Sequence, residues 1–323
     1  MNAQPETTAA VGSVSRSTTE NSLLLPGLDG TNPLGFLAAL GVLRTLTVPD
    51  DEDRATMSWT RFGGTWSPRI MGCGSDIESL LERLQTALNA SDAEPWTLDS
   101  KLPFPAETLK AACVEALSLS SIHQRDRADT LASFGVECLR DDKGNFSDTS
   151  LRMVRSGDSA GNGLTAYGQR IRNETTIEDL RRALLEIWCY DDEGCALRWA
   201  PAENNAYALQ WNNPSGEKAT SVRGGNRLAL AAMPMLPVVP GKHKAATTGF
   251  SRPEGRTECL TWPLWDQPAS LPVVQSLLLL EELQQQQPSA KEIQARGITA
   301  VYRTDRVMTS TYYRNFTPAR RIA

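Results

Sequence analysis

The most apolar helical pattern in the chain extends from Pro33 to Leu46 and follows a turn sequence rich in Gly and Asp. Asn32 is a good N-cap, and a proline at the first helical position gives up an N–H that has no partner there. Apolar residues occupy every face of this segment, which indicates a helix buried in a core. At about 14 residues it is too short to span a bilayer, which needs roughly 20. Gly35 and Gly41 lower its helix propensity, so we expect a closely packed neighbour.

Further helices are predicted where apolar residues recur with the 3.6-residue period of an amphipathic helix. These segments are Asp76–Ala90, Ala106–Ser120, Thr176–Tyr190, Ser270–Leu283 and Ser289–Arg296. Ser75 with Glu78, and Thr175 with Glu178, have the spacing of a capping box at the start of two of these helices. The charged segment 123–129 is expected to lie on the surface.

Short β-strands are predicted in other apolar segments, several of which adjoin turns that contain Gly, Asn or Asp. They lie within Met57–Met71, Leu131–Leu139, Leu151–Val154, Ala196–Trp199, Tyr207–Trp211, Ile298–Tyr302 and Val307–Tyr313. For Met57–Met71 the alternative is a loop that carries aromatic side chains. Leu151–Val154 is expected to pair with Leu131–Leu139. Ala196–Trp199 and Tyr207–Trp211 should form a hairpin-like pair, with Trp199 and Trp211 as core anchors. We therefore predict an α+β fold in which amphipathic and buried helices pack with short, mostly antiparallel strands.

Composition divides the chain into three regions. Residues 1–22 are rich in Ala, Ser, Thr and Glu and predict a disordered tail. Residues 23–190 form a helix-rich region around the buried helix 33–46, and residues 191–323 form a basic α+β region. A chain of 323 residues is long enough for one large domain or for two. The two regions can therefore also be continuous as one domain.

The overall composition is that of a soluble globular protein, with 40% hydrophobic and 22% charged residues. Six cysteines are scattered without a CxxC pair, which argues against a structural zinc site and against a disulfide framework. No apolar run reaches transmembrane length, and the N-terminus lacks a basic-then-apolar signal sequence. We therefore expect a cytoplasmic protein with reduced thiols and no membrane partner.

Charge is distributed unevenly along the chain, although the net charge is only −5. Residues 1–160 hold 14 Lys/Arg and 22 Asp/Glu, whereas residues 161–323 hold 19 and 16. Within the second half, Lys218–Arg256 has seven Lys/Arg and a single Glu, and Arg296–Ala323 has six Arg and a single Asp. Such basic segments favour binding of a polyanion, because the distribution of charge matters more than its total.

The first basic segment contains two candidate nucleic-acid-binding loops. Arg223–Arg227 places two arginines beside a Gly-Gly pair ahead of a short apolar helix. Glycine lets backbone N–H groups approach a phosphate, and a helix N-terminus attracts it. Gly241–Phe250 presents Lys242 and Lys244 with two Thr hydroxyls, which are donors suited to phosphate and sugar oxygens. A Pro-rich apolar spacer separates the loops, so they can form opposite walls of one groove; the alternative is a pair of solvated surface loops.

The second basic segment mixes arginines with aromatic residues. Arg303, Arg306 and Arg314 lie in or near predicted strands. Tyr312, Tyr313 and Phe316 interleave with Arg314, a composition that can combine base stacking with phosphate contact. The candidate nucleic-acid-binding residues are Arg223, Asn226, Arg227, Lys242, Lys244, Arg252, Arg303, Arg306 and Arg314. Asn226 could read a base edge, while the lysines would contact phosphates.

No catalytic motif is evident in the sequence. It contains no HExxH or GxxxxGK[ST] pattern. GxSxG occurs once, at Gly157–Gly161, within the Gly-rich polar segment 155–163 that we interpret as a flexible loop. The Asp and Glu residues do not form the carboxylate block that a metal nuclease typically uses. Cys113 and His123 could pair as nucleophile and base. However, Cys113 lies on the apolar face of its predicted helix, where a thiol normally packs. We predict a non-enzymatic protein with no catalytic residue, no metal and no other cofactor.

The opening LxGxNP and the FLAALGVLR helix that follows resemble the start of large-subunit-like CRISPR-associated proteins of the type I-G system, formerly called I-U. Later segments that resemble the same group are Ala196–Trp199, Tyr207–Trp211, Gly224–Pro240, Thr247–Phe250, Thr261–Trp265 and Tyr313–Pro318. The resemblance therefore extends over most of the chain after residue 22. The chain is short for a full large subunit.

This resemblance implies a non-catalytic component of a type I CRISPR RNA-guided surveillance complex (Cascade) in antiviral defence. Such a component binds target DNA and helps recognise the protospacer-adjacent motif, while pairing with the guide RNA reads the sequence. Its partners are the other complex subunits, the guide RNA, the target DNA and a separate helicase–nuclease. Two alternatives stay open: an accessory protein that recruits the helicase–nuclease through its acidic N-terminal half, and an enzyme with an unrecognised active site.

Overall fold

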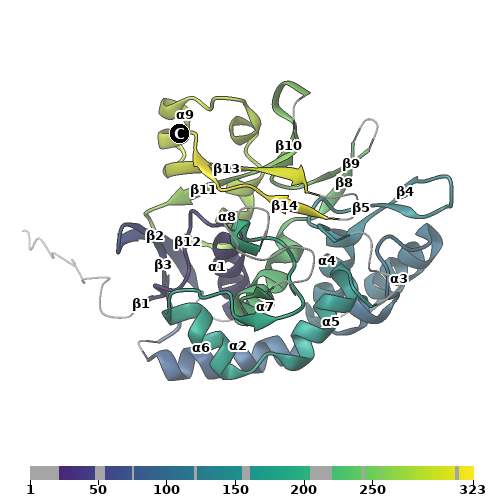
Figure 1. Cartoon of the computed structure of the whole chain (residues 1–323), viewed down its shortest axis with the longest axis horizontal. Coiled ribbons are helices and arrows are strands. Elements are labelled where there is room, and N and C mark those ends of the chain that lie inside the picture. Colours follow the sequence, from purple (N-terminus) through teal and green to yellow (C-terminus); the bar gives the residue numbers. More distant parts are fainter. Residues whose placement is uncertain are drawn as a thin grey trace, which may run out of the picture.

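The computed structural model describes residues 22–47, 55–74, 76–119, 122–154, 161–203, 220–241, 244–255, 257–309 and 313–323, without the side chains of residues 122–124. Within these residues the protein has the α+β architecture that the sequence predicts. Helices form the lower part of the molecule in Figure 1, and the two larger antiparallel sheets lie at its upper and left sides. The predicted disordered tail lies outside the described residues except for Ser22.

Two helices at the centre of the molecule, α1 (Pro33–Leu46) and α7 (Arg223–Ala232), pack against each other (Figure 1). The Asn32 side chain caps α1, as predicted, by accepting a hydrogen bond from a backbone N–H of the first turn at 3.0 Å. A Cβ atom at Gly41 would overlap the backbone carbonyl of Leu228 in α7. The glycine therefore lets the two helix backbones approach closely, which confirms the expected close neighbour.

The remaining helices surround this pair. They are α2 (Ile77–Ala90), α3 (Ala106–Ser118), α4 (Ile122–Phe134), α5 (Leu164–Glu174), α6 (Ile177–Leu185), α8 (Leu271–Leu278) and α9 (Ala290–Ala295). Asp76 caps α2 by accepting a hydrogen bond from the Ser79 N–H at 2.9 Å; the predicted cap, Ser75, lies outside the described residues. At α6 the capping box consists of Thr176 and Asp179, one residue beyond the predicted pair, because Thr176 has the extended backbone of an N-cap.

Helix α6 ends at Leu185 and does not continue to Tyr190 as predicted. The chain turns after it, so that the Trp188 indole packs back and donates a hydrogen bond to the Ala183 carbonyl at 2.9 Å. This side chain satisfies a carbonyl of the last turn, which otherwise has no partner within the helix. Ile187, expected on the buried face, is 92% exposed as a consequence of the turn.

The strands that the structure describes pair only in antiparallel fashion. A four-stranded sheet has the order β1 (Ser22–Leu24), β3 (Thr65–Met71), β2 (Thr56–Phe62) and β12 (Ala269–Ser270). A five-stranded sheet contains β10 (Phe250–Ser251), β11 (Cys259–Trp265), β13 (Ile298–Met308) and β14 (Arg314–Phe316) in that order, with β15 (Arg320–Arg321) also paired to β13. Two-stranded ribbons join β4 (Gly135–Arg140) with β5 (Phe146–Asp148), β6 (Asp192–Glu193) with β7 (Thr220–Ser221), and β8 (Val238–Pro240) with β9 (Ala245–Thr247).

Several strand predictions are wrong in extent or pairing. Leu131–Phe134 is the last turn of α4, so the first half of that predicted strand is helical. Its second half, β4, pairs with β5 across the predicted Asp-Asp-Lys-Gly turn and not with Leu151–Val154. The strand predicted at Ile298–Tyr302 continues to Met308 as β13, which includes only the first two residues of the strand predicted at Val307–Tyr313. Ala196–Trp199 forms no strand, and its predicted partner Tyr207–Trp211 lies outside the described residues.

One hydrophobic core connects the helix-rich region with the basic region, since residues on both sides of position 190 contribute to it. Phe36 of α1 stacks between Trp59 of β2 and Trp262 of β11, with ring centroids 6.0 and 5.6 Å apart. The Trp262 indole donates a hydrogen bond to the Gly30 carbonyl at 2.8 Å. Trp199 is fully buried, as predicted. In the part of the chain that the structure describes, no helix has both the length and the apolar character needed to cross a bilayer.

Candidate nucleic-acid interface

Sheet register places three charged residues in one row across the five-stranded sheet. The registers of β10 with β11 and of β11 with β13, continued by one residue, put Arg252 and Arg306 on either side of Glu258. The Arg306 N–H accordingly donates to the Glu258 carbonyl at 2.7 Å. Because opposite residues of an antiparallel pair lie on the same face, their side chains meet. Arg306 Nη1 lies 2.8 Å from Glu258 Oε2, and Arg252 Nη2 lies 3.6 Å from Glu258 Oε1.

A third cation reaches the same carboxylate from the β8–β9 hairpin. Lys244 directly precedes β9, and its Nζ lies 4.0 Å from Glu258 Oε1. The side chains of Lys244 and Arg252 are 56% and 48% exposed, whereas those of Arg306 and Glu258 are 11% and 14% exposed. Two exposed cations therefore form a rim around a largely buried arginine–glutamate pair.

Two more arginines lie close to this row. Arg306 Nη2 donates to the Arg152 carbonyl at 2.8 Å, and the Arg152 guanidinium pairs with Asp148 at 2.8 Å. Burial lowers the pKa of Arg306 to about 10, an effect that Glu258 opposes and that the charge of Arg314 reinforces. Arg306 therefore stays protonated at neutral pH. We define the basic cluster as Lys244, Arg252, Arg306 and Arg314; the first three surround Glu258, and Arg314 acts on Arg306 through its charge.

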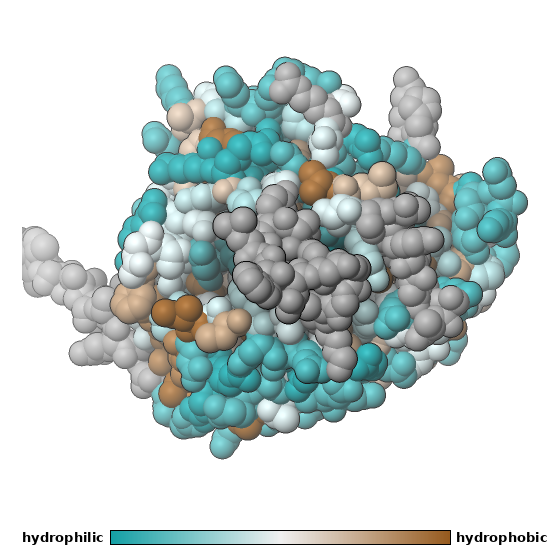
Figure 2. Space-filling model, viewed as in Figure 1, coloured by the Kyte–Doolittle hydropathy of each residue, from teal (hydrophilic) through white to brown (hydrophobic). Residues whose placement is uncertain are grey.

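The basic cluster lies at one end of the five-stranded sheet. Figure 1 shows β9, β10 and the C-terminal end of β13 close together in the upper part of the molecule. Hydrophilic residues predominate over β13 on the face seen in Figure 2. Next to the row, Phe316 lies opposite Arg306 in the register and stacks on Phe250, with 6.1 Å between the ring centroids. This aromatic pair therefore packs beside the row of charged residues.

The predicted glycine-rich phosphate loop at Arg223–Arg227 is wrong, because these residues form the first turns of α7. A Cβ atom at Gly224 would overlap the backbone carbonyl of Asp179 in α6. The glycine thus serves helix packing rather than the approach of a phosphate. Arg223 itself is partly exposed, and its Nη1 lies 3.9 Å from Asp179 Oδ2. The expected groove between two basic loops is therefore not formed, since one of its walls is a helix packed into the core.

Asn226 and Arg227 are buried and do not present their side chains to a ligand. The Arg227 guanidinium donates to the Leu88 carbonyl in the last turn of α2. A cation is favourable at the C-terminal end of a helix, where carbonyl groups lack intrahelical partners. Burial lowers the pKa of Arg227 to about 9. Both residues are structural, which corrects their assignment to nucleic acid.

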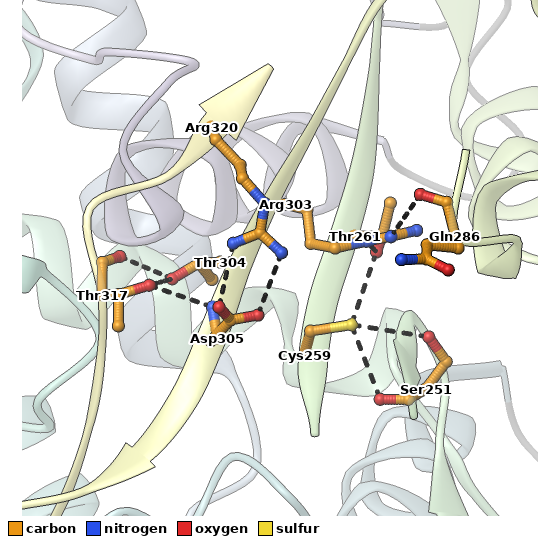
Figure 3. Close-up of polar contacts among 9 residues, drawn as sticks. All are labelled: Ser251, Cys259, Thr261, Gln286, Arg303, Thr304, Asp305, Thr317 and Arg320. Atoms are coloured by element: carbon orange, nitrogen blue, oxygen red, sulfur yellow. Dashed lines mark hydrogen bonds and ion pairs between the residues drawn. The ribbon is translucent and has the colours of Figure 1, made fainter. Parts of the chain in front are cut away.

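Arg303 also acts inside the protein and not at a nucleic-acid surface. Its Nε donates to Thr261 Oγ1 at 2.8 Å and its Nη1 donates to the Gln286 carbonyl at 3.0 Å (Figure 3). Arg303 Nη2 also donates to the carbonyls of Leu283 and Gln285. The guanidinium therefore connects the segment after α8 to the sheet. Figure 3 also shows Arg320 directed at Asp305, with 2.9 Å between the charged groups.

The structure thus brings only part of the predicted set together. The candidates that meet in the basic cluster are Lys244, Arg252, Arg306 and Arg314. Lys242 lies outside the described residues. Sequence reasoning missed Glu258, which lies two residues beyond the basic segment that ends at Arg256. Only the register of β11 with β13 reveals its role, and that pairing joins residues nearly fifty positions apart.

A second polar cluster is buried beside the first turns of α7. Glu203 is 1% exposed, and burial raises its pKa to about 7. Its Oε1 lies 3.5 Å from Asn226 Nδ2. Glu203 Oε2 and Asn226 Oδ1 have no hydrogen-bond partner among the described residues. Both orphaned atoms are acceptors when the glutamate is ionised, whereas a protonated Oε2 is a donor.

Metal and thiol chemistry receive little support from the side chains that the structure describes. Among these residues, no group of three or more His, Cys, Asp or Glu side chains could hold a metal ion. Burial raises the pKa of the Cys113 thiol, which disfavours the nucleophilic thiolate. The side chain of His123 lies outside those described.

Comparison with known proteins identifies no relative of this chain. Neither a family model, nor a curated protein, nor a solved structure matches it. Its function has to be inferred from the geometry of the basic cluster together with the sequence.

Proposed function

We propose that this protein is a non-catalytic nucleic-acid-binding subunit that contacts a phosphate backbone through the basic cluster. The observation that carries the proposal is that Lys244, Arg252 and Arg306 share one carboxylate, Glu258. Three cations around one anion leave a local excess of positive charge. Exposed cations in excess are the groups that neutralise backbone phosphates.

The members of the basic cluster have different parts in this proposal. Lys244 and Arg252 reach solvent and would contact phosphate oxygens directly. Arginine offers a planar pair of donors for one phosphate, whereas lysine acts as a point charge. Arg306 is largely buried and would contribute its field while it holds Glu258 in place. Phosphate contacts position a nucleic acid without reading its sequence, so any reading of bases would use groups outside the cluster.

The resemblance to type I-G CRISPR proteins supports a more specific role. Arg252 and Glu258 lie between two of the resembling segments, Thr247–Phe250 and Thr261–Trp265. We therefore propose that the chain binds target DNA within an RNA-guided surveillance complex and helps recognise the protospacer-adjacent motif. Its partners would be the other complex subunits, the guide RNA and a separate helicase–nuclease, in a division of labour where this chain performs no hydrolysis.

The affinity of the purified chain for labelled duplex and single-stranded DNA tests this proposal. Replacing both exposed cations, Lys244→Ala with Arg252→Ala, should weaken binding on the order of tenfold, because the variant lacks two groups that neutralise phosphates. A matched control, Lys110→Ala with Arg125→Ala, removes the same two residue types from exposed positions of α3 and α4. The control should bind like the wild type. Absence of binding by the wild type, or equal affinity of both folded double variants, would contradict the proposal.

A further inference from the structure

The two oxygens of the Glu258 carboxylate make two different kinds of contact. Oε2 lies 2.8 Å from Arg306 Nη1, within hydrogen-bond distance in a largely buried pair. Oε1 lies 3.6 Å from Arg252 Nη2 and 4.0 Å from Lys244 Nζ, which is beyond that distance. Oε1 therefore attracts the two exposed cations without bonding tightly to either.

A backbone phosphate would present the same chemistry to these cations, since it also offers two anionic oxygens. We propose that the Glu258 carboxylate stands where a backbone phosphate would otherwise act, and that nucleic acid binds by drawing Lys244 and Arg252 away from it. Glu258 is then an internal competitor that sets the affinity of the basic cluster. This inference rests on the proposed function and adds to it the residue that regulates the site.

The exchange is feasible because the contacts to be replaced are weak. Ion pairs between exposed side chains contribute little to stability. A phosphate oxygen can accept charge-assisted hydrogen bonds from the same donors at about 2.8 Å. The long side chains of Lys244 and Arg252 can turn toward solvent while their backbones stay in place.

The base of the cluster stays fixed during this exchange. The Arg306 N–H is bonded to the Glu258 carbonyl at 2.7 Å, and Arg306 Nη2 is bonded to the Arg152 carbonyl at 2.8 Å. These bonds hold Glu258 and Arg306 opposite each other whether or not the rim cations move. Binding therefore requires a rearrangement of two exposed side chains and not of the sheet.

An internal carboxylate also selects for a polymeric ligand. Glu258 is tethered beside its cations, so its effective concentration there is high. A free phosphate or a mononucleotide must overcome this competition with a single group. A polynucleotide offers neighbouring phosphates and releases several counterions on binding. The ligand class that fits is therefore a nucleic-acid strand and not a small phosphate ester.

Replacement of Glu258 by glutamine tests this inference. Glu258→Gln keeps an oxygen that can accept from Arg306 Nη1, removes the negative charge, and places an amide NH2 where Oε1 faces the exposed cations. Affinity for the labelled strands should rise on the order of fivefold, as expected for the loss of one nearby like charge in a high-dielectric setting. The same substitution made in the Lys244→Ala, Arg252→Ala background should change affinity much less. In that background the two exposed cations for which Glu258 competes with nucleic acid are absent.

The matched control is Glu282→Gln, which neutralises another carboxylate that is ion-paired with an arginine, Arg296, at 3.0 Å. It should leave affinity unchanged. If Glu258→Gln does not fold, Glu258→Asp retracts the carboxylate from the rim cations while it keeps the charge, and it should tighten binding in the same direction. Unchanged or weaker binding by a folded Glu258 variant would overturn the inference. If the rim cations matter but Glu258 does not, the proposed function stands and only this inference fails.

Discussion

Guanidinium groups in this protein are stabilised in two different ways. Arg306 is ion-paired with the carboxylate of Glu258, whereas Arg303 donates to carbonyl and hydroxyl oxygens and Arg227 donates to the Leu88 carbonyl. A buried arginine that is not ion-paired depends on such hydrogen bonds for the solvation that it loses. Its removal should therefore affect folding more than binding.

Arg227→Ala should lower the free energy of unfolding by about 2–4 kcal/mol, since it removes a buried hydrogen bond and leaves a cavity between α7 and α2. Arg223→Ala is the neighbouring control. Its side chain is partly exposed and its 3.9 Å pair with Asp179 contributes at most about 1 kcal/mol. Urea denaturation of both variants measures the difference. Equal midpoints for Arg227→Ala and the wild type would contradict the structural role.

Glu203 makes stability depend on pH. The folded state raises its pKa to about 7 from the ordinary value of 4.5, mainly through burial. Folding therefore favours the protonated carboxyl, which can donate from Oε2 toward an acceptor such as Asn226 Oδ1. The contribution of this group is complete below pH 4.5 and is lost as the pH rises through 7. At about 1.4 kcal/mol per pKa unit, the loss is on the order of 3 kcal/mol.

Glu203→Gln should remove most of this pH dependence, because glutamine is neutral at every pH and keeps a donor for Asn226. Relative to the wild type, the variant should be more stable at pH 8 and of similar stability at pH 4.5. Unfolding by urea across this range provides the measurement. A stability difference between variant and wild type that stays constant with pH would refute the assignment of the proton to Glu203.

At the scale of elements, the contact between α1 and α7 organises the fold. Both helices carry glycines where another backbone comes close: Gly41 meets α7, and Gly224 meets α6. A methyl group at either position would push two helices apart. Close approach of backbones is therefore a requirement shared by the two central helices.

Gly41→Ala should destabilise the protein by about 3 kcal/mol or more, because the added Cβ overlaps the Leu228 carbonyl in a packed core. In an exposed helix the same change would stabilise by up to about 1 kcal/mol. A loss of stability on Gly41→Ala therefore indicates close packing of α1 against α7, whereas a gain indicates that the position is exposed. Calorimetry gives the result directly, and a rise in melting temperature would show that α1 and α7 are not in such contact.

Local signals predicted some elements well and others poorly. The turn, the N-cap and the apolar run of α1 lie next to one another in sequence, so they identify that helix without knowledge of the rest. Leu131–Leu139 is mostly apolar, and this pattern suits either a helix or a strand, so the α4–β4 boundary was not predictable. The pairing of β4 with β5 and the continuity of β13 depend on long-range packing. Such contacts leave little trace in a local pattern.

The candidate site shows the same limit. Lys244, Arg252 and Arg306 were predictable from the charge pattern, because they lie in segments that hold six or seven basic residues and a single acidic one. The burial of Arg227 and Arg303 was not predictable, since the carbonyls that solvate them come from distant segments. A basic residue in a sequence can therefore be a buried residue that hydrogen-bonds to distant segments as readily as a residue that contacts a ligand.

At the scale of the whole molecule, charge is sorted in sequence but only partly in space. The net charge is −5, and the two basic segments Lys218–Arg256 and Arg296–Ala323 supply side chains to the interior as well as to the surface. Among the described residues, side chains from the two segments meet at the end of the five-stranded sheet, around Glu258. Under the proposed function, a polyanion would contact the protein there.

Salt dependence of DNA binding tests this central claim most directly. Each phosphate that a cationic side chain neutralises adds about 0.9 to the magnitude of the slope of log affinity against log salt concentration on duplex DNA. Lys244→Ala with Arg252→Ala should therefore lower the magnitude of the slope by about 1.8, while Lys110→Ala with Arg125→Ala leaves it unchanged. A slope that is the same for the wild type and both folded double variants would show that the basic cluster does not contact the phosphate backbone.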